Sequence, residues 1–306
     1  MSAGRLHIAF DPIYAHPLPE GHRFPMLKYE LIPGQLLYEG CISQDHLVSP
    51  QTCPDEVVLL AHDVAYVQRL QNLELSAKEQ REIGFPQSAA LMEREWRIAQ
   101  GTIDCALAAR QSGVALNVAG GTHHAFRHRG EGFCLLNDIA IGAMYLLEAG
   151  LSKQVLVIDL DVHQGNGTAA IFRDVKEVFT FSMHGAHNYP FRKEQSDLDI
   201  GLADGSNDEM YLSVLSHTLE GLLEQVKPDF VFYQAGVDIL GTDRYGKLNI
   251  SMEGCAQRDR IVFESLYNKS IPCAVSMGGG YSRDLRHIVE AHCQTFRLAK
   301  EIWMLD

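Results

Sequence analysis

The sequence of 306 residues lacks any apolar run that approaches the roughly 18 residues needed to span a bilayer. Residues 1–11 contain no basic segment followed by an apolar stretch, so we expect no secretion signal and a cytoplasmic location. The seven cysteines are scattered, odd in number and never spaced as C-x-x-C. This pattern predicts reduced thiols and argues against a disulfide framework or a cysteine-rich zinc site.

Features of nucleotide-binding and nucleic-acid-binding proteins are also missing. Neither G-x-G-x-x-G nor G-x-x-x-x-G-K-[ST] occurs, so nucleotide binding has little support. The 26 Lys and Arg residues are outnumbered by 39 Asp and Glu residues, which gives a formal net charge of −13. This balance disfavours direct binding to nucleic acid, which depends on neutralising phosphates. The acidity either steers a basic peptide substrate toward the protein or simply aids solubility.

Short β-rich runs alternate with longer helical patterns along the whole chain. The expected strands are 6–10, 114–118, 155–160, 178–182, 230–234 and 271–276. The expected helices are 87–110, 136–149, 168–173, 208–225, 253–268 and 283–303. Such alternation predicts an α/β fold with a parallel sheet and helices on both faces. No internal repeat or shift in composition marks a boundary, so residues 1–306 are expected to form one domain.

The stretch 155–163 starts as an apolar strand and ends in three polar residues at alternate positions. Alternate side chains of a strand share one face, so Asp159, Asp161 and His163 are expected to point together. Two carboxylates at the end of a buried strand are costly unless an opposite charge compensates them. A divalent cation would do so, and oxygen and nitrogen ligands suit Zn²⁺ or a similar transition metal. The alternative is an acidic strand end that caps the next helix.

Polar or glycine-rich segments also follow four other expected strands. They contain His123 and His124, Met183 and His184, Asp238, and Gly278 to Tyr281. Ligands of open parallel sheets bind beyond the carboxyl ends of the strands. Five strands that deliver such residues to one edge of the sheet indicate an active site.

Asp161, His163 and Asp238 would supply the three protein ligands of a catalytic zinc, which keeps a further position open for water. The cation would lower the pKa of its water from about 15.7 toward neutrality, so that a nearby base could complete the deprotonation. The tandem pair of His123 and His124 is the candidate source of that base, because imidazole titrates near neutral pH.

Each histidine of the pair needs an acceptor on its other ring nitrogen to fix its tautomer. Asp159 is expected to hold one ring and Asn166 the other. Tyr281 follows three glycines and is a candidate donor of a hydrogen bond to a developing oxyanion. Candidates for an aromatic slot that holds an apolar chain are Gly132, Phe133 and Tyr189, although ordinary core packing explains them equally well.

Several segments together closely resemble the zinc-dependent histone deacetylase family, which includes bacterial deacetylase-like and acetoin-utilisation-type members. These segments are Gly120-Gly121-Thr122-His123-His124-Ala125, Gly132-Phe133-Cys134-Leu135-Leu136-Asn137-Asp138, Asp159-Leu160-Asp161-Val162-His163-Gln164-Gly165-Asn166-Gly167, Ala235-Gly236-Val237-Asp238 and Gly278-Gly279-Gly280-Tyr281. The resemblance covers nearly the whole chain in the family's order. It implies the arginase-like fold, a three-layer αβα domain around a central, mainly parallel eight-stranded sheet.

The resemblance also implies an activity and a site. The activity is metal-dependent hydrolysis of the amide of an N-acyl-lysine, in a peptide or protein, with zinc or ferrous iron as the metal. The implied zinc ligands are Asp161, His163 and Asp238. The implied general base and acid is His124, and its electrostatic partner is His123, oriented by Asp159. The implied oxyanion donor is Tyr281. The implied acyl-lysine tunnel is bordered by Gly132, Phe133 and Tyr189, with Tyr245 of segment 241–246 at the lip. A structural potassium ion would use Asp159, Asp161, His163, Ser182 and Met183, partly through backbone carbonyls.

One position departs from the family pattern and several alternatives stay open. Many family members carry Asp where this chain has Asn166, which predicts a somewhat lower pKa for His124. A binuclear arginase-type hydrolase shares the fold, but it would need an Asp-x-His-x-Asp run, and here Gln164 and Gly165 follow the histidine. A deacetylase of polyamines or other small acylated amines would favour an acidic lip, for which Asp243 is the candidate. A non-catalytic acyl-lysine binding module is the third alternative.

Overall fold

Eight strands form one parallel sheet in the computed structural model, which describes residues 4–306. The strands are β1 (His7–Ala9), β2 (Leu47–Val48), β3 (Val114–Asn117), β4 (Val155–Asp159), β5 (Val178–Gly185), β6 (Leu198–Leu202), β7 (Phe230–Gln234) and β8 (Cys273–Ser276). Their order across the sheet is β2-β1-β3-β8-β7-β4-β5-β6. The predicted α/β fold with a parallel eight-stranded sheet is therefore confirmed.

The central strands are buried along their whole length because helices cover both faces of the sheet. This burial explains their continuous apolar runs, such as the Val155 to Ile158 stretch of β4. The sequence patterns missed the two edge strands. β2 has only two residues, and β6 alternates half-buried and exposed positions before its buried last residue.

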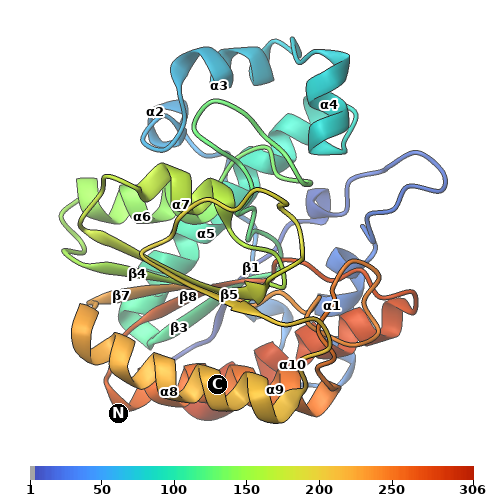
Figure 1. Ribbon diagram of the computed structural model, residues 1–306. Helices are drawn as coiled ribbons and strands as arrows, with labels where there is room; N and C mark the ends of the chain where they lie inside the picture. Colours follow the sequence, from blue (N-terminus) through green and yellow to red (C-terminus); the bar gives the residue numbers. More distant parts are fainter. Residues whose placement is uncertain (1–3) are drawn as a thin grey trace.

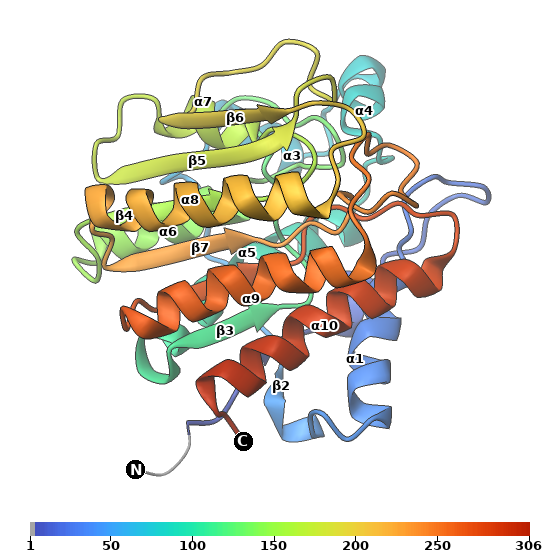
Figure 2. The ribbon, with the colours of Figure 1, turned by 60° about the horizontal axis from the view of Figure 1, so that its bottom comes forward.

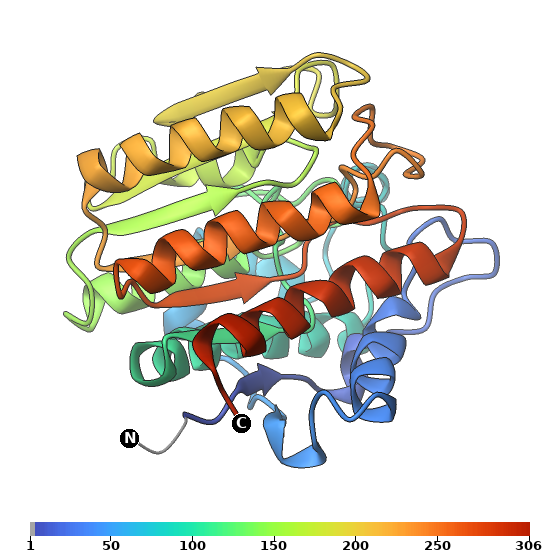
Figure 3. The same cartoon turned by 90° about the horizontal axis from the view of Figure 1, so that it is seen from below.

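Helices form layers on both sides of the sheet (Figure 1 and Figure 2). The helices are α1 (Lys28–Tyr38), α2 (Asp55–Val58), α3 (Val64–Gln71), α4 (Ala77–Ile83), α5 (Ala89–Ser112), α6 (Asp138–Glu148), α7 (Asn166–Phe172), α8 (Asp208–Val226), α9 (Met252–Asn268) and α10 (Leu285–Trp303), with short 3-10 helices at Pro12–Tyr14 and Gln44–His46. Helices α8, α9 and α10 lie side by side over one face, as Figure 3 shows, and α5, α6 and α7 cover the other. Helices α2, α3 and α4 lie beyond that second layer (Figure 1).

The chain builds the two outer parts of the sheet first and then returns to fill its middle with β7 and β8. The last residues of the central strands are in register: Asp159 pairs with Gln234, Gln234 with Ser276, and Ser276 with Asn117. The loops that follow β3, β4, β7 and β8 therefore leave the sheet at the same level. This alignment brings segments distant in sequence to one edge.

Helices α5 to α10 agree with the six predicted helices to within a few residues at each end. Helices α1 to α4 were not predicted from the sequence. Three of them have eight residues or fewer, and α1 carries Pro33 in its interior. Within residues 4–306, none of the helices combines the length and the apolar character that crossing a membrane requires.

Candidate active site

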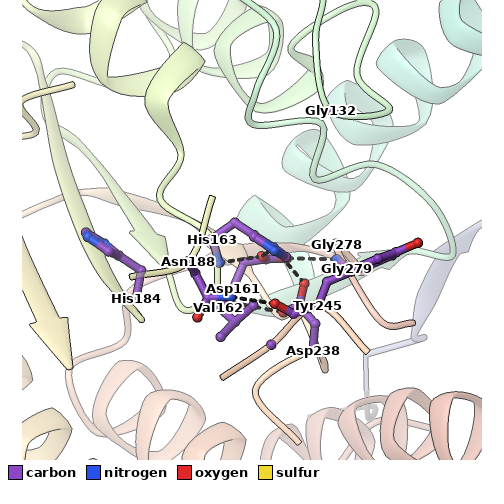
Figure 4. Close-up of polar contacts among 12 residues, drawn as sticks. Gly132, Asp161, Val162, His163, His184, Asn188, Asp238, Tyr245, Gly278 and Gly279 are labelled. Carbon is purple, nitrogen blue, oxygen red and sulfur yellow. Dashed lines mark hydrogen bonds and ion pairs between the residues drawn. The ribbon is translucent and has the colours of Figure 1, made fainter. Parts of the chain in front are cut away.

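Two aspartates and one histidine form a buried cluster at the carboxyl edge of the sheet. Asp161 and His163 follow β4, and Asp238 follows the neighbouring β7. His163 Nδ1 lies 3.0 Å from Asp161 Oδ1 and 3.1 Å from Asp238 Oδ2. One ligand atom from each residue lies within 4.8 Å of the others. The three side chains point toward one another (Figure 4), as the alternation in sequence predicted for the first two.

Backbone amides hold the two carboxylates in place. The amide of Val162 donates to Asp238 Oδ1 at 2.9 Å, and the amide of Gly279 donates to Asp161 Oδ2 at 2.8 Å. A Cβ atom on Gly279 would lie only 2.0 Å from Asp238 Oδ2, so glycine is required for this close approach. The glycines before Tyr281 thus bring the backbone against the cluster.

The donor set of this cluster fits a divalent transition metal. Two carboxylates and one imidazole would balance two positive charges, in a site from which water is largely excluded. Burial lowers the pKa of His163, but hydrogen bonds to Asp161 and Asp238 outweigh it and raise the pKa to about 10. Burial and the charge of Asp161 raise the pKa of Asp238 to about 7. In the absence of a cation, protons therefore neutralise part of the negative charge here.

The histidine pair lies beside this cluster, and each ring has the expected partner. His123 Nδ1 is 2.7 Å from Asp159 Oδ2, and His124 Nδ1 is 2.6 Å from Asn166 Oδ1. In neutral histidine these acceptors place the proton on Nδ1 and leave Nε2 as the basic nitrogen. The two rings lie 4.2 Å apart between centroids.

The two histidines have opposite pKa shifts. Burial lowers the pKa of His123, but the carboxylates of Asp159 and Asp161 outweigh it and raise the pKa to about 9. Burial, together with the positive charges of His123 and His163, lowers the pKa of His124 well below its ordinary value. A pair of titratable groups with pKa values pushed apart is typical of an acid–base site. These shifts favour a protonated His123 and a neutral His124 at pH 7.

Glu131 connects this pair to the wall of the pocket and was not predicted from the sequence. Asn166 Nδ2 donates to Glu131 Oε1 at 2.7 Å, and the hydroxyl of Tyr189 donates to the same oxygen at 2.7 Å. Arg129 Nε lies 3.5 Å from the other carboxylate oxygen. The signal available in the sequence was an acidic residue directly before Gly132.

Aromatic rings form the wall of a pocket above the histidines and the acidic cluster. The ring of Phe133 lies 5.2 Å from that of Phe24 and 5.9 Å from that of Tyr281, between centroids. Tyr189 faces them across His124, with its ring 5.0 Å from the imidazole. Phe24 belongs to a segment for which the sequence patterns predicted no element.

Gly132 permits close contact between this wall and the base. Its φ is +56°, and a Cβ atom there would lie 2.7 Å from His124 Cδ2. The pocket opens to the surface through a cavity of about 400 Å³ whose lining includes Tyr245. The rings of Tyr245 and Tyr281 are 5.2 Å apart between centroids.

Tyr281 is nearly buried and lines the pocket above the acidic cluster. Burial, with the nearby carboxylates of Asp238 and Asp161, raises its pKa well above the ordinary value. The phenol therefore keeps its proton at neutral pH and is available as a hydrogen-bond donor.

Ser182 and Met183 are buried in β5, next to the strand that carries Asp159. Asp159 and Ser182 are register partners in the β4–β5 pair. The hydroxyl of Ser182 contacts His184 Nδ1 at 2.9 Å, and Figure 4 shows His184 apart from the Asp161–His163–Asp238 cluster. The residues expected to hold potassium thus lie together, and potassium itself stays a prediction.

The chain is similar to known proteins over nearly its whole length. Residues 22–296 match the family model described as the histone deacetylase domain. The chain is 45% identical, over 297 residues, to a protein from Picosynechococcus described as uncharacterized, covering 97% of this chain and 99% of that one. It is 29% identical over 277 residues to histone deacetylase 2 of Arabidopsis thaliana, covering 88% and 72% of the two chains.

The fold leads to the same family. The crystal structure of a histone deacetylase homolog from Aquifex aeolicus superimposes with a TM-score of 0.83 at 25% identity, over 99% of this chain and 85% of that one. The resemblance expected from the motifs, and the arginase-like fold that it implied, are confirmed. The chain belongs to the histone deacetylase family.

Proposed function

We propose that this protein hydrolyses the amide bond of N-acyl-lysine side chains with the help of a divalent metal. One observation supports this most: a buried Asp–His–Asp cluster and a histidine of lowered pKa lie together at the base of an aromatic pocket. Metal-assisted hydrolysis needs such a combination of metal ligands, base and substrate channel. We also propose that the single sheet and its helices constitute one catalytic domain.

Asp161, His163 and Asp238 would hold the metal, with zinc or ferrous iron as the candidates. Bound there, the cation would act as a Lewis acid on the acyl carbonyl and lower the pKa of water near it. Ser182 and Met183 would complete the structural potassium site together with Asp159, Asp161 and His163. These assignments rest on the family and on the chemistry of the donors.

His124 would act first as a base and then as an acid. Its neutral ring takes a proton from the attacking water, because Asn166 holds the other nitrogen as a donor. His123, made cationic by Asp159, stabilises the negative charge that develops on the substrate. His124 then returns the proton to the departing lysine amine, which leaves a free lysine and a carboxylate.

Tyr281 would donate a hydrogen bond to the oxygen of the acyl group as that oxygen gains charge. Its raised pKa keeps the phenolic proton in place. Phe133, Tyr189 and Phe24 would enclose the apolar part of the acyl-lysine side chain, with Gly132 beside the base and Tyr245 at the lip. Each of these residues thus has a role in the proposed reaction.

Two alternatives find less support. Asp243, the candidate acid for a polyamine substrate, accepts hydrogen bonds from the backbone amides of Tyr245, Gly246 and Tyr281, so it is occupied inside the protein. A second metal of the arginase type would need a carboxylate at position 165, where this chain has Gly165 and therefore no ligand side chain. The side chain of the preceding Gln164 bonds to Asp199 and to the carbonyl of Glu194. Within residues 4–306, the Asp161 cluster is the one group of three such ligands.

The test is hydrolysis, by zinc-loaded protein, of matched lysine peptides that carry acetyl, octanoyl or myristoyl groups, with acetylspermidine alongside. We expect turnover of at least one peptide, with loss of that turnover in His124→Ala. His217→Ala is the matched control, because His217 is exposed on α8 and does not line the pocket. Turnover of acetylspermidine alone would make the protein a polyamine deacetylase. Metal-loaded protein that turns over none of these substrates would point to a binding module.

The cytoplasmic location expected from the sequence stays a prediction.

A further inference from the structure

The mouth of the pocket carries a charge opposite to that of the protein as a whole. The segments that line it include the 15–27 loop, helix α4, the loop after β5 and the loop after β7. In Figure 2, the strands point toward the side of the molecule where these segments gather. The segments contribute Arg23, Arg81, His187 and Lys247, and a single carboxylate, Glu82.

Two of the cationic side chains at the mouth are free. Arg23 and Arg81 are exposed, and neither side chain makes a hydrogen bond or an ion pair with any other residue of the described range 4–306. Lys247 lies 3.8 Å from Asp204, which His187 also contacts. Both side chains of the lysine pair are about half exposed, so the contact is weak and screened by solvent.

The acidic groups near the mouth do not cancel these charges. Glu82 lies 3.7 Å from Lys78, one turn earlier on the same helix. Asp243 is engaged by backbone amides, and Glu131 lies deeper in the pocket, bonded to Asn166 and Tyr189. The free charge at the entrance is therefore positive, in a chain with a net charge of −13.

We propose that the natural substrate presents acidic side chains next to its acyl-lysine, and that Arg23, Arg81 and Lys247 bind them. The inference rests on the proposed deacylase function and specifies its substrate class. A positive entrance attracts a peptide rich in Asp and Glu, and it repels a lysine-rich peptide or a polyamine. Phe191, 89% exposed at the same entrance, offers an apolar contact for a neighbouring peptide residue.

A set of three peptides tests the proposal. Each carries one acetyl-lysine, flanked on both sides by a pair of Asp, Gln or Lys residues. We expect kcat/KM to be about threefold to tenfold higher for the Asp-flanked peptide than for the Lys-flanked one, because exposed charge pairs have small individual effects. High salt is expected to reduce this ratio.

Variants connect the preference to the named residues. In Arg23→Gln/Arg81→Gln, the ratio between acidic and basic peptides is expected to approach one. The matched control is Arg110→Gln/Lys153→Gln, which removes two exposed charges near the opposite edge of the sheet, and it is expected to keep the wild-type ratio. Hydrolysis of all three peptides without an acidic preference would overturn this inference alone. Failure to hydrolyse any of them, also when the same three sequences carry octanoyl-lysine or myristoyl-lysine, would overturn the proposed function and this inference with it.

Discussion

The carboxamide of Asn166 bonds to His124 through its oxygen and to Glu131 through its nitrogen, at 2.6 and 2.7 Å. An amide suits this position because the imidazole needs an acceptor and the carboxylate needs a donor. Glu131 therefore explains why an amide fits at position 166: its carboxylate accepts the hydrogen bond that only an amide, and not an aspartate, can donate. The same carboxylate also holds the hydroxyl of Tyr189.

The first prediction concerns Asn166→Asp. Alone, this change would place a second carboxylate against Glu131, where like charges disfavour joint ionisation. We expect kcat/KM to fall about tenfold, which corresponds to about 1.4 kcal/mol in the barrier. In the double variant Asn166→Asp/Glu131→Gln, the amide and the carboxylate exchange places, and we expect most of the activity to return.

The pH profile of that double variant gives a second readout. A carboxylate beside His124 would raise its pKa, which burial and the neighbouring cations hold well below the ordinary value. A base with a raised pKa loses its proton at higher pH, so the acidic limb of the kcat/KM profile should move to higher pH. An unmoved limb would show that this imidazole does not act as the base.

The second prediction concerns Tyr281→Phe. The variant keeps the ring and removes the hydroxyl, which we propose as the donor to the acyl oxygen. We expect kcat to fall by about 10²–10³, the usual cost of one oxyanion donor, with zinc content unchanged. Full turnover in the variant would remove Tyr281 from the mechanism. Tyr267→Phe is the matched control, because it also removes one tyrosine hydroxyl, but from a partly exposed residue of α9 outside the pocket.

Metal binding provides the third prediction. Hydrogen bonds to Asp161 and Asp238 raise the pKa of His163 to about 10, against the effect of burial, so the metal-free protein holds a proton there at pH 7. A metal needs the neutral imidazole and the ionised carboxylate of Asp238, whose pKa burial and the charge of Asp161 raise to about 7, so binding at pH 7 should release between one and two protons. Calorimetric titration with Zn²⁺ in buffers of different ionisation enthalpy measures that number. Binding without proton release would contradict the proposed ligand set.

The fourth prediction concerns His62, which supports the segment that carries the histidine pair. His62 Nδ1 donates to the carbonyl of Phe126 at 3.0 Å, and Nε2 accepts from the amide of Asn137 at 2.9 Å. Asn137 in turn caps α6, where Asp138 accepts from the backbone amide of Thr122 at 2.8 Å. The neutral imidazole of His62 thus holds the start of α6, and Asp138 at that end of the helix binds the backbone just before the histidine pair.

Burial lowers the pKa of His62 to about 4. The unfolded chain binds a proton near its ordinary pKa of about 6.5, so the stability contributed by this group is present above that pH and is lost as the pH falls toward 4. The loss amounts to at most about 3 kcal/mol in the free energy of unfolding. Denaturant unfolding of His62→Gln at several pH values should show a smaller pH dependence than wild type. An equal dependence, or the same decrease in the exposed control His217→Gln, would contradict this role.

The sequence predicted the structure correctly where one short segment contains both a strand and the polar residues of the site. The apolar run before Asp159 predicted a buried strand, and its alternating polar end brought Asp161 and His163 to one side. The pairing of Asp159 with His123, and of Asn166 with His124, was expected and is present as short hydrogen bonds. The catalytic roles assigned to these residues stay predictions.

Features that depend on several distant loops could not be predicted from the sequence. Arg23, Arg81 and Lys247 line one entrance only because separate segments fold over the same edge of the sheet. For the same reason Phe24 lines the inner pocket, and Glu131 contacts Asn166 and Tyr189. Net charge was a poor guide to the entrance, since −13 describes the whole surface while the field at a pocket depends on the few nearest groups.

Hydrolysis of an acetyl-lysine peptide in ¹⁸O-labelled water, by zinc-loaded protein, is the decisive measurement for the proposed deacylase. We expect free lysine peptide and acetate that carries one solvent oxygen per turnover, with both products lost in His124→Ala and retained in His217→Ala. A peptide that stays acetylated while it binds the protein, or acetate without label, would contradict hydrolysis by an activated water.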